Sequence, residues 1–167
     1  MAARAQRGFS FIELVMVIVV FGIVAAVAAP LLNNAFRAYF TGKDIAETDW
    51  QARVAIERMT RDLRGIRAPV DITMTSASDM SYVDTDGNAV RYCQGAVGGC
   101  PGAAGDLMRN GQALASGVSG LAFSYLTRAG AATATPASVF YVTVAFTDPQ
   151  NNVVKSYSAT VSPRNFP

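Results

Sequence analysis

The sequence contains no histidine, only two cysteines and one tryptophan among its 167 residues, and charged residues make up 16% of it. Without histidine the chain cannot form a Ser-His-Asp or Cys-His catalytic group, an imidazole zinc site or an imidazole pH switch. Two cysteines are too few for a four-thiolate zinc or iron–sulfur site. A formal net charge of +2 is too small to indicate a nucleic-acid-binding protein.

Patterns that bind phosphate or support nucleophilic catalysis are also missing from the sequence. The glycine-rich segment at residues 95–99 is not followed by Lys-Ser/Thr or by the start of a helix, as a phosphate-binding loop would be. No nucleophile–base pair and no pair of catalytic carboxylates stands out. The sequence therefore predicts a protein that is not an enzyme and has no cofactor.

The few charges that are present are unevenly distributed along the chain. Residues 1–8 carry two arginines and no acidic residue, and residues 9–36 carry Glu13 alone. Residues 37–67 contain seven basic and five acidic side chains, whereas residues 68–167 contain five basic and six acidic ones. The net charge of the whole chain therefore equals that of its first eight residues.

A long uncharged run follows the basic N-terminal segment. Leu14–Phe36 is 23 residues without a charge, which exceeds the roughly 20 residues that a helix needs to cross a bilayer. Gly22 and Pro30 lie inside this run, and membrane helices tolerate such residues better than soluble helices do. Because Arg4 and Arg7 precede the run, the positive-inside rule predicts a cytoplasmic N-terminus and a C-terminal part on the opposite side.

Three interpretations of this N-terminal segment compete. A secretory signal peptide is one, since Ala26-Val27-Ala28 offers an A-x-A cleavage site after a basic region. A plain membrane anchor is the second, and it accounts for the length and orientation of the run. Neither explains why the acidic Glu13 stands at the start of the apolar run, or the Gly8-Phe9 junction before it.

The third interpretation uses all of these residues. The segment Arg7-Gly8-Phe9-Ser10-Phe11-Ile12-Glu13-Leu14 resembles the cleavage and methylation motif of type IV prepilins. The resemblance implies cleavage between Gly8 and Phe9 by a prepilin peptidase, followed by N-methylation of Phe9. It also implies assembly roles for Glu13, Gly22 and Pro30.

Glu13 has two possible roles in an apolar helix. An unpaired buried charge is costly and usually finds a partner. By the resemblance, that partner is the free amine of a neighbouring subunit's first residue, and the pair would set the register between subunits, as a buried polar residue does in a coiled coil. The alternative is a carboxylate that reaches toward water at the edge of the membrane.

Residues 37–67 continue as an amphipathic helix. Apolar residues recur at spacings of three, four and seven, and charged residues occupy the other faces. The apolar stripe consists of Ile45, Ala52, Ile56, Met59, Leu63 and Ile66. Gly65 and Pro69 mark the end of the helix. The five arginines of residues 53–67 are more consistent with a solvated face than with a nucleic-acid or anionic-lipid patch, because acidic residues alternate with them.

After Pro69 the sequence changes to a β pattern. The expected strands are Asp71–Thr75, Met80–Asp84, Ala89–Cys93, Val118–Thr127, Val139–Thr147 and Val153–Val161. On one face of the fifth we expect Phe140, Val142, Val144 and Phe146. Asp86-Gly87 predicts one hairpin turn and residues 148–152 a second hairpin connection. We therefore expect an α+β fold, with a long N-terminal helix packed on a C-terminal antiparallel sheet, as in pilins.

Two features of the β-rich segment are candidates for chemistry. Cys93 and Cys100 lie in a glycine-rich loop, and if the chain faces an oxidising compartment we expect a disulfide rather than a redox pair, because C-x-x-C spacing is missing. The acidic turn with Asp84, Asp86 and Asn88 is a weak calcium candidate. It lacks the glutamate that closes an EF-hand loop, and a hairpin turn explains the same residues.

The expected organisation has four parts: a leader at 1–8 cleaved after Gly8, a transmembrane and assembly helix at 9–36, an amphipathic continuation at 37–67, and a β-rich periplasmic head at 68–167. The resemblance implies a structural minor pilin or pseudopilin. Its partners would be other such subunits, a prepilin peptidase, the inner-membrane assembly platform and membrane lipid, with no nucleic acid.

Residues 52–64 resemble minor subunits of the J type in type II secretion, the W type in type IV pili and the O type in mannose-sensitive haemagglutinin pili. Such subunits are implied to start assembly at the inner membrane and to sit at or near the tip of an extracellular or periplasmic fibre. The alternative function is a single-pass, membrane-anchored periplasmic binding module that does not polymerise, and an enzyme is a distant third.

Overall fold

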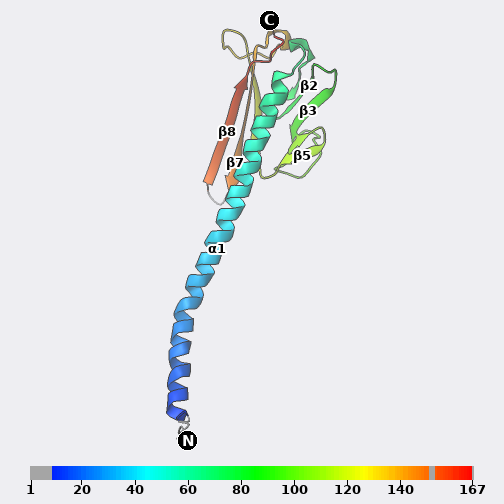
Figure 1. Cartoon of the computed structure of the whole chain (residues 1–167). Coiled ribbons are helices and arrows are strands. Elements are labelled where there is room, and N and C mark those ends of the chain that lie inside the picture. The colour runs from blue at the N-terminus through cyan, green and yellow to red at the C-terminus, as the bar shows by residue number, and fades with distance from the viewer. Residues whose placement is uncertain (1–8, 151–152, 167) are drawn as a thin grey trace, which may run out of the picture. The chain divides into compact units, whose positions relative to one another are not determined.

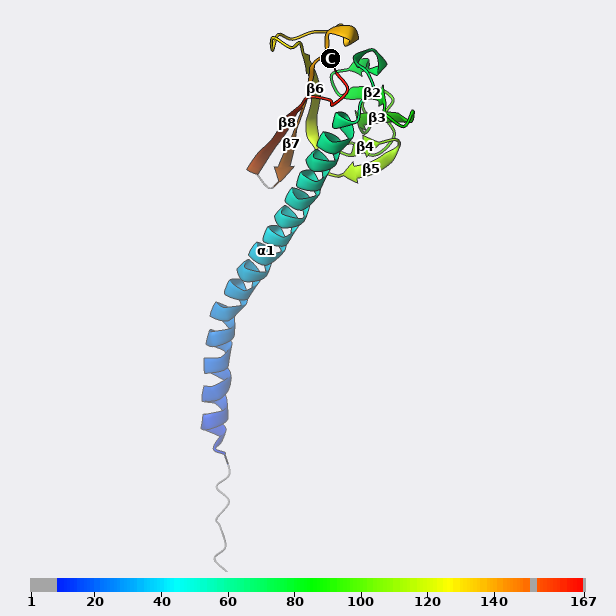
Figure 2. The same cartoon turned by 45° about the horizontal axis from the view of Figure 1, so that its top comes forward.

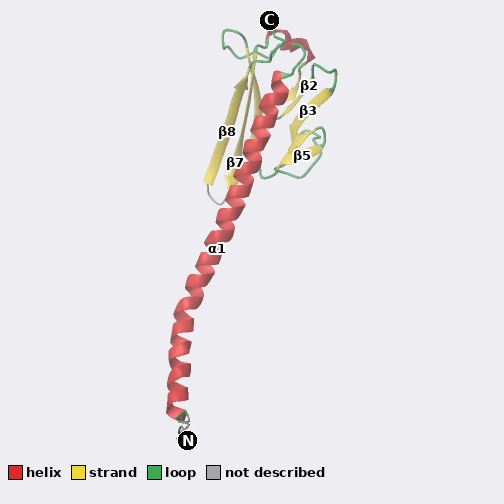
Figure 3. Cartoon of the chain, in the orientation of Figure 1, coloured by secondary structure: helices red, strands yellow, loops and turns green. Residues whose placement is uncertain are grey.

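The computed structural model describes residues 9–150 and 153–166. The chain divides into two compact units. We call residues 1–43 the N-terminal unit and residues 44–167 the C-terminal unit. The first contains only helix from Phe11 onward, and the second combines helix with two β-sheets (Figure 3). The predicted leader lies outside the described residues, and the predicted division at residues 36 and 67 stays a prediction.

One helix, α1, spans Phe11–Arg64 (Figure 1). It ends three residues earlier than the sequence predicts. At its end the backbone N–H of Gly65 donates to the carbonyl of Asp62, which tightens the last turn. The following residue, Ile66, already forms an antiparallel bridge with Asp84, so the chain is extended from this point. Two short 3₁₀ turns, η1 at Pro69–Asp71 and η2 at Pro136–Ser138, each begin with proline, as suits its fixed φ.

The described residues of the C-terminal unit form eight strands. They are β1 Thr73–Ser76, β2 Asp79–Val83, β3 Ala89–Gln94, β4 Leu107–Arg109, β5 Gln112–Ala115, β6 Ser119–Leu126, β7 Tyr141–Gln150 and β8 Val153–Val161. All pairs are antiparallel and follow the chain order, β1 to β5 in one sheet and β6 to β8 in another. The structure therefore has two sheets where the sequence suggests one.

The hairpin of β4 and β5 is absent from the sequence-based prediction. Its strands are only three and four residues long, too short to show a clear alternation. The signal that predicts it is the turn, because Asn110 and Gly111 both have positive φ, 49° and 81°. Asn-Gly is the residue pair that a tight hairpin turn favours, since both central positions need this conformation.

The core of the C-terminal unit lies between the last turns of α1 and both sheets (Figure 2). The helix contributes Ala52, Ala55, Met59 and Leu63, all buried. Ile45 and Ile56 of the predicted stripe are only partly buried, and Ala55 is buried although the stripe omits it. The three-stranded sheet contributes the alternate residues of β7, so Val142, Val144 and Phe146 are buried as expected.

The N-terminal end of β7 differs from the prediction. Phe140 lies outside the strand and is only partly buried, and Val139 is the buried residue before it. The guanidinium of Arg128 lies 4.9 Å from the centre of the Phe140 ring, so this side chain packs under a cation instead. The other end of β7 also differs from the prediction: the strand continues through residues 148–150, which the sequence assigns to the hairpin connection, because they pair with β8 as far as Gln150 with Val153. The predicted turn residues Asn151 and Asn152 lie outside the described residues.

Candidate functional site

The N-terminal unit presents an apolar helix surface that no other part of the described chain covers. The most apolar 18-residue window of α1 has a mean hydropathy of 2.9, and none of it is buried. Even the large side chains Phe21 and Leu31 are 73% and 65% exposed. Exposed apolar surface of this extent on a single helix indicates a membrane span or a helix that packs with other chains.

The start of α1 places Glu13 in its first turn. The Ser10 carbonyl accepts from the backbone N–H groups of Glu13, at 3.0 Å, and Leu14, at 3.2 Å, so Ser10 is the residue that opens the helix. A carboxylate in this turn is favourable because the free N–H groups of a helix N-terminus carry partial positive charge. Within the described part of the chain, the carboxylate of Glu13 has no hydrogen bond or ion pair, and the residue is exposed.

The structure describes the other predicted assembly residues only in part. Phe9 is described and is 82% exposed, whereas Gly8 lies outside the described residues. Gly22 has no atom within 4 Å of the place where a Cβ would stand. Pro30 lies inside the helix and has no N–H to donate to the preceding turn. No contact within the described chain explains Gly22 or Glu13, and their roles in assembly stay predictions.

In the C-terminal unit, Asp49 joins α1 to β8. Its carboxylate accepts from the Lys155 ammonium at 3.0 Å, from the Arg53 guanidinium at 3.0 Å, and from the Tyr157 hydroxyl. The hydrogen bond from Tyr157, reinforced by both cations, holds the pKa of Asp49 well below its usual range. Burial, together with the bond to this carboxylate, raises the pKa of Tyr157 to about 12.

Asp62 joins α1 to the five-stranded sheet in a similar way. Its carboxylate oxygen accepts from the Tyr92 hydroxyl and from Nε of Arg109, each at 2.7 Å. Tyr92 is fully buried, and burial is the main cause that raises the pKa of its phenol, with this hydrogen bond second. The charge pattern of this helix predicts only a solvated face, and the roles of Asp49 and Asp62 do not follow from it. The available signal was their position beside the apolar stripe.

The disulfide between Cys93 and Cys100 is present, which confirms that prediction. Cys93 lies on β3 and Cys100 in the loop before β4, and both pack with Met108 in a small buried cluster of their own. The loop is tightly built: a Cβ on Gly95 would stand 2.2 Å from the carbonyl oxygen of Ala103. Closing so short a loop contributes about 2–3 kcal/mol in the chain-entropy model.

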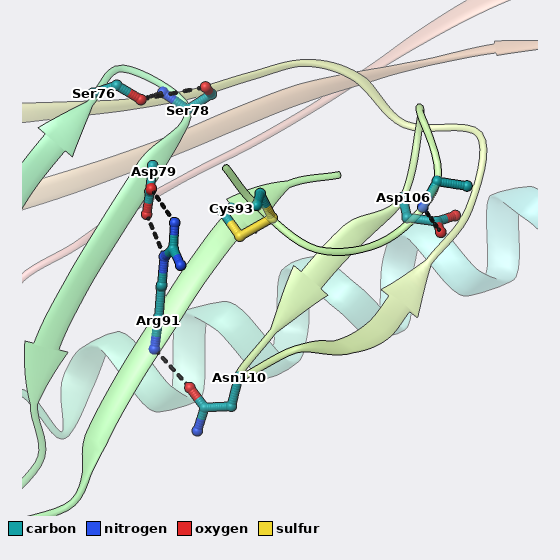
Figure 4. The surroundings of a disulfide bond; sticks show 9 residues. Ser76, Ser78, Asp79, Arg91, Cys93, Asp106 and Asn110 are labelled. Atoms are coloured by element: carbon teal, nitrogen blue, oxygen red, sulfur yellow. Dashed lines mark hydrogen bonds and ion pairs between the residues drawn. A yellow bond between two sulfur atoms is a disulfide. The ribbon is translucent and has the colours of Figure 1, made fainter. Parts of the chain in front are cut away.

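The surroundings of the disulfide are held by an ion pair (Figure 4). The guanidinium of Arg91 donates to both oxygens of the buried Asp79, at 3.0 and 2.6 Å. The backbone N–H of Arg91 donates to the side-chain oxygen of Asn110 at 2.7 Å, which ties β3 to the β4–β5 turn. These contacts have a structural role, since Arg91 supplies the hydrogen bonds that the Asp79 carboxylate accepts and also connects two strands.

The acidic turn at residues 84–88 uses its oxygens internally. The Asp84 carboxylate accepts from the backbone N–H groups of Asp86 and Asn88 at 2.9 and 2.8 Å, and from the Asn88 amide at 3.3 Å. These bonds, that to the Asn88 backbone first, lower the pKa of Asp84. The described residues contain no group of three Asp, Glu, His or Cys that could hold a metal ion. Calcium at this turn stays a weak prediction.

A comparison with known protein families matches the N-terminal segment. The model of the family described as the prokaryotic N-terminal methylation motif aligns with residues 3–29. The matched residues include the Gly8-Phe9 junction, Glu13 and the apolar run as far as Ala29. The match covers the motif and none of the strands, so only the structure describes the β-rich part of the chain.

Proposed function

We propose that this chain, a type IV pilin-like protein by its methylation motif, long N-terminal helix and antiparallel sheets, is a minor subunit that starts fibre assembly or sits at the fibre tip. The observation that carries the proposal is the exposed apolar part of α1, with Glu13 in its first turn, inside the matched motif. Such a helix is stable only in lipid or against other helices, and a pilin-type subunit passes from one to the other.

A broader assignment of this chain rests on the matched motif. The chain is a pilin- or pseudopilin-like subunit with a structural, non-enzymatic role, and its N-terminal helix and motif indicate a membrane-anchored prepilin. The motif also implies processing by a prepilin peptidase and handling by the pilus assembly machinery. The proposed pilin-type function rests on this motif, and no absence of a ligand or metal is used as evidence for it.

In the proposed mechanism, cleavage after Gly8 frees the amine of Phe9, which is then methylated. The helix waits in the inner membrane with its N-terminus cytoplasmic, because Arg4 and Arg7 precede the apolar run. On extraction, apolar contacts with neighbouring helices replace contacts with lipid. Glu13 of one subunit pairs with the terminal amine of another, and the cost of leaving that carboxylate unpaired sets the register.

The helix at residues 52–64 also favours a particular type of minor subunit. Residues 52–64 are similar to the helix of J-type subunits in type II secretion and of W-type and O-type minor pilins. The strand with Tyr92 and Cys93 and the segment at residues 117–125 favour the last two. In this structure the similar helical segment supplies the buried face Ala52, Ala55, Met59 and Leu63, so the similarity lies in the part that packs on the sheets.

The first test is the mass of the mature N-terminus, isolated from a host with a prepilin peptidase. We expect a chain that begins at methylated Phe9. An intact Met1 would favour a plain membrane anchor that presents a binding module, and a terminus near Ala29 would favour a secretory signal peptide.

The second test is Glu13→Ala in cells that assemble the fibre. We expect incorporation to fall by about tenfold or more, because the amine of the neighbouring subunit loses its buried partner. The amount of membrane-bound protein and the Cys93–Cys100 disulfide should not change. Glu47→Ala is the matched control, since Glu47 is an exposed glutamate on the same helix outside the apolar run. Normal incorporation of Glu13→Ala would contradict the mechanism.

A further inference from the structure

A hollow of about 390 Å³ lies at the C-terminal end of α1. The C-terminal segment of the chain passes close to this end of the helix (Figures 1 and 2). The lining of the hollow consists of Arg61, Arg64, Gly65, Thr85, Arg164 and Asn165. The C-terminal segment is fixed by two hydrogen bonds: the backbone N–H of Arg164 donates to the Arg64 carbonyl, and the Asn165 amide donates to the Ile66 carbonyl, each at 3.1 Å. Residues a hundred positions apart are thereby brought to one site.

The charge of this hollow is unbalanced. Its lining has three arginines and no acidic residue. Four other arginines of the C-terminal unit form ion pairs with aspartates, as Arg53 does with Asp49 and Arg91 with Asp79, whereas Arg58 and Arg128 form none among the described residues. What distinguishes the hollow is that three unpaired arginines line one site. Among the described residues, no acidic side chain forms an ion pair with the three arginines of the hollow. Three like charges that share a site repel one another, so an anion bound there is favoured.

Attraction to the end of the helix does not account for the cluster by itself. The free carbonyls of a helix C-terminus favour cations in its last turn, which explains Arg61 and Arg64. Arg164 belongs to a different segment and is held in place by its backbone. Thr85 and Asn165 add a hydroxyl and an amide to the lining, and such neutral groups give a bound carboxylate directional hydrogen bonds.

An adjoining hollow limits which anion fits. It measures about 180 Å³ and shares Arg61, Gly65 and Thr85 with the first. Its lining also includes the carboxylates of Asp62, Asp84 and Asp86 and the Tyr82 ring, whose buried hydroxyl has no hydrogen-bond partner among the described residues. Asp62 is neutralised by Arg109, whereas the other two carboxylates repel a second nearby negative charge. A long polyanion such as a nucleic acid is therefore disfavoured.

We propose that the arginine hollow, formed by Arg61, Arg64 and Arg164, binds a carboxylate side chain on a segment of a partner protein. An Asp or Glu of that segment accepts hydrogen bonds from the guanidinium groups. The residues next to it in the segment are neutral, so Asp84 and Asp86 of the adjoining hollow do not repel them. This interface goes beyond the proposed function and does not depend on cleavage at Gly8-Phe9. The mass of the N-terminus of the same preparation therefore reports on the proposed function separately.

The test uses the full chain in detergent micelles and a short peptide with two glutamates among neutral residues. NMR signals of the arginine Nε–H groups report binding residue by residue. We expect the peptide to shift Arg61, Arg64 and Arg164 in a saturable way, and its glutamine counterpart to shift none. The double variant Arg64→Gln/Arg164→Gln should bind at least about tenfold more weakly, since two charge-assisted contacts are lost.

Arg58→Gln/Arg128→Gln is the matched control, because it also removes two arginine charges, one of them from α1, and both residues lie outside the hollow. Its affinity should equal that of the unsubstituted chain. If Arg64→Gln/Arg164→Gln does not fold, Arg61→Gln alone should weaken binding. Equal affinity of the control and of Arg64→Gln/Arg164→Gln would overturn the proposal. Tighter binding of a single-stranded oligonucleotide than of the glutamate peptide would overturn it too.

Discussion

At the scale of single residues, two carboxylates on α1 determine how the sheets attach to it. Asp49 takes its bonds from β8 and Asp62 takes its bonds from β3 and β4. Each side chain is partly shielded from water, with exposures of 20% for Asp49 and 19% for Asp62. Partly shielded pairs of this kind fix a geometry more than they add stability, because removing charges from water offsets much of their attraction.

The pKa of Asp49 predicts how stability depends on pH. Hydrogen bonds and cations lower this pKa from 3.8 in the folded state, so the unfolded chain takes up the proton first as the pH falls. The contribution of Asp49 is therefore complete above about pH 4 and is lost as the pH falls through the folded pKa. We expect Asp49→Asn to flatten the decline of the thermal midpoint between neutral and strongly acidic pH.

Thermal unfolding of the full chain in detergent, followed across this pH range, measures the effect. Asp44→Asn provides the control, since Asp44 is exposed and its carboxylate has no partner among the described residues. Identical acid profiles for Asp49→Asn and the unsubstituted chain would show that another carboxylate dominates the decline.

At the scale of elements, the last turns of α1 serve as one wall of the core for both sheets. Buried side chains of the three-stranded and the five-stranded sheet belong to the same core cluster as Met59 and Leu63 of the helix. Neither sheet could therefore bury its inner face alone. The helix in turn depends on the sheets, since its buried face packs into the same core cluster as the inward side chains of both sheets.

Leu63→Ala tests this mutual dependence. The side chain is fully buried, so its truncation should lower the free energy of unfolding of the C-terminal unit by about 2–5 kcal/mol. Arg58→Ala changes an exposed residue of the same helix and should alter it by less than about 0.5 kcal/mol. Chemical denaturation followed by circular dichroism separates the two, and a comparable loss in both variants would mean that the helix face is not the wall described.

At the scale of the whole molecule, the formal net charge depends on where the chain is cleaved. The complete chain has 14 basic and 12 acidic side chains, a formal net charge of +2. Removing residues 1–8 takes away Arg4 and Arg7 and leaves 12 of each sign, so the net charge falls to zero. Cleavage after Ala28 would also remove Glu13 and leave 12 basic and 11 acidic side chains, or +1.

Isoelectric focusing distinguishes these three products. We expect the chain from a host with a prepilin peptidase to focus well below the 8.7 that the complete sequence gives, near neutrality. The chain from a host without that enzyme should focus at the higher value. Equal positions from both hosts would contradict processing at Gly8-Phe9.

The sequence by itself determined the N-terminal apolar helix, its motif, the α+β class and the disulfide. Each depends on contacts between near neighbours or on an uninterrupted pattern: 23 uncharged residues, a fixed spacing around Gly8 and Phe9, and two cysteines seven positions apart. Only the tertiary structure decided that there are two sheets, that Asp49 and Asp62 tie them to α1, and that Arg164 joins Arg61 and Arg64. These pairings link residues far apart in the chain, and no local spacing encodes which distant partner a charged side chain will meet.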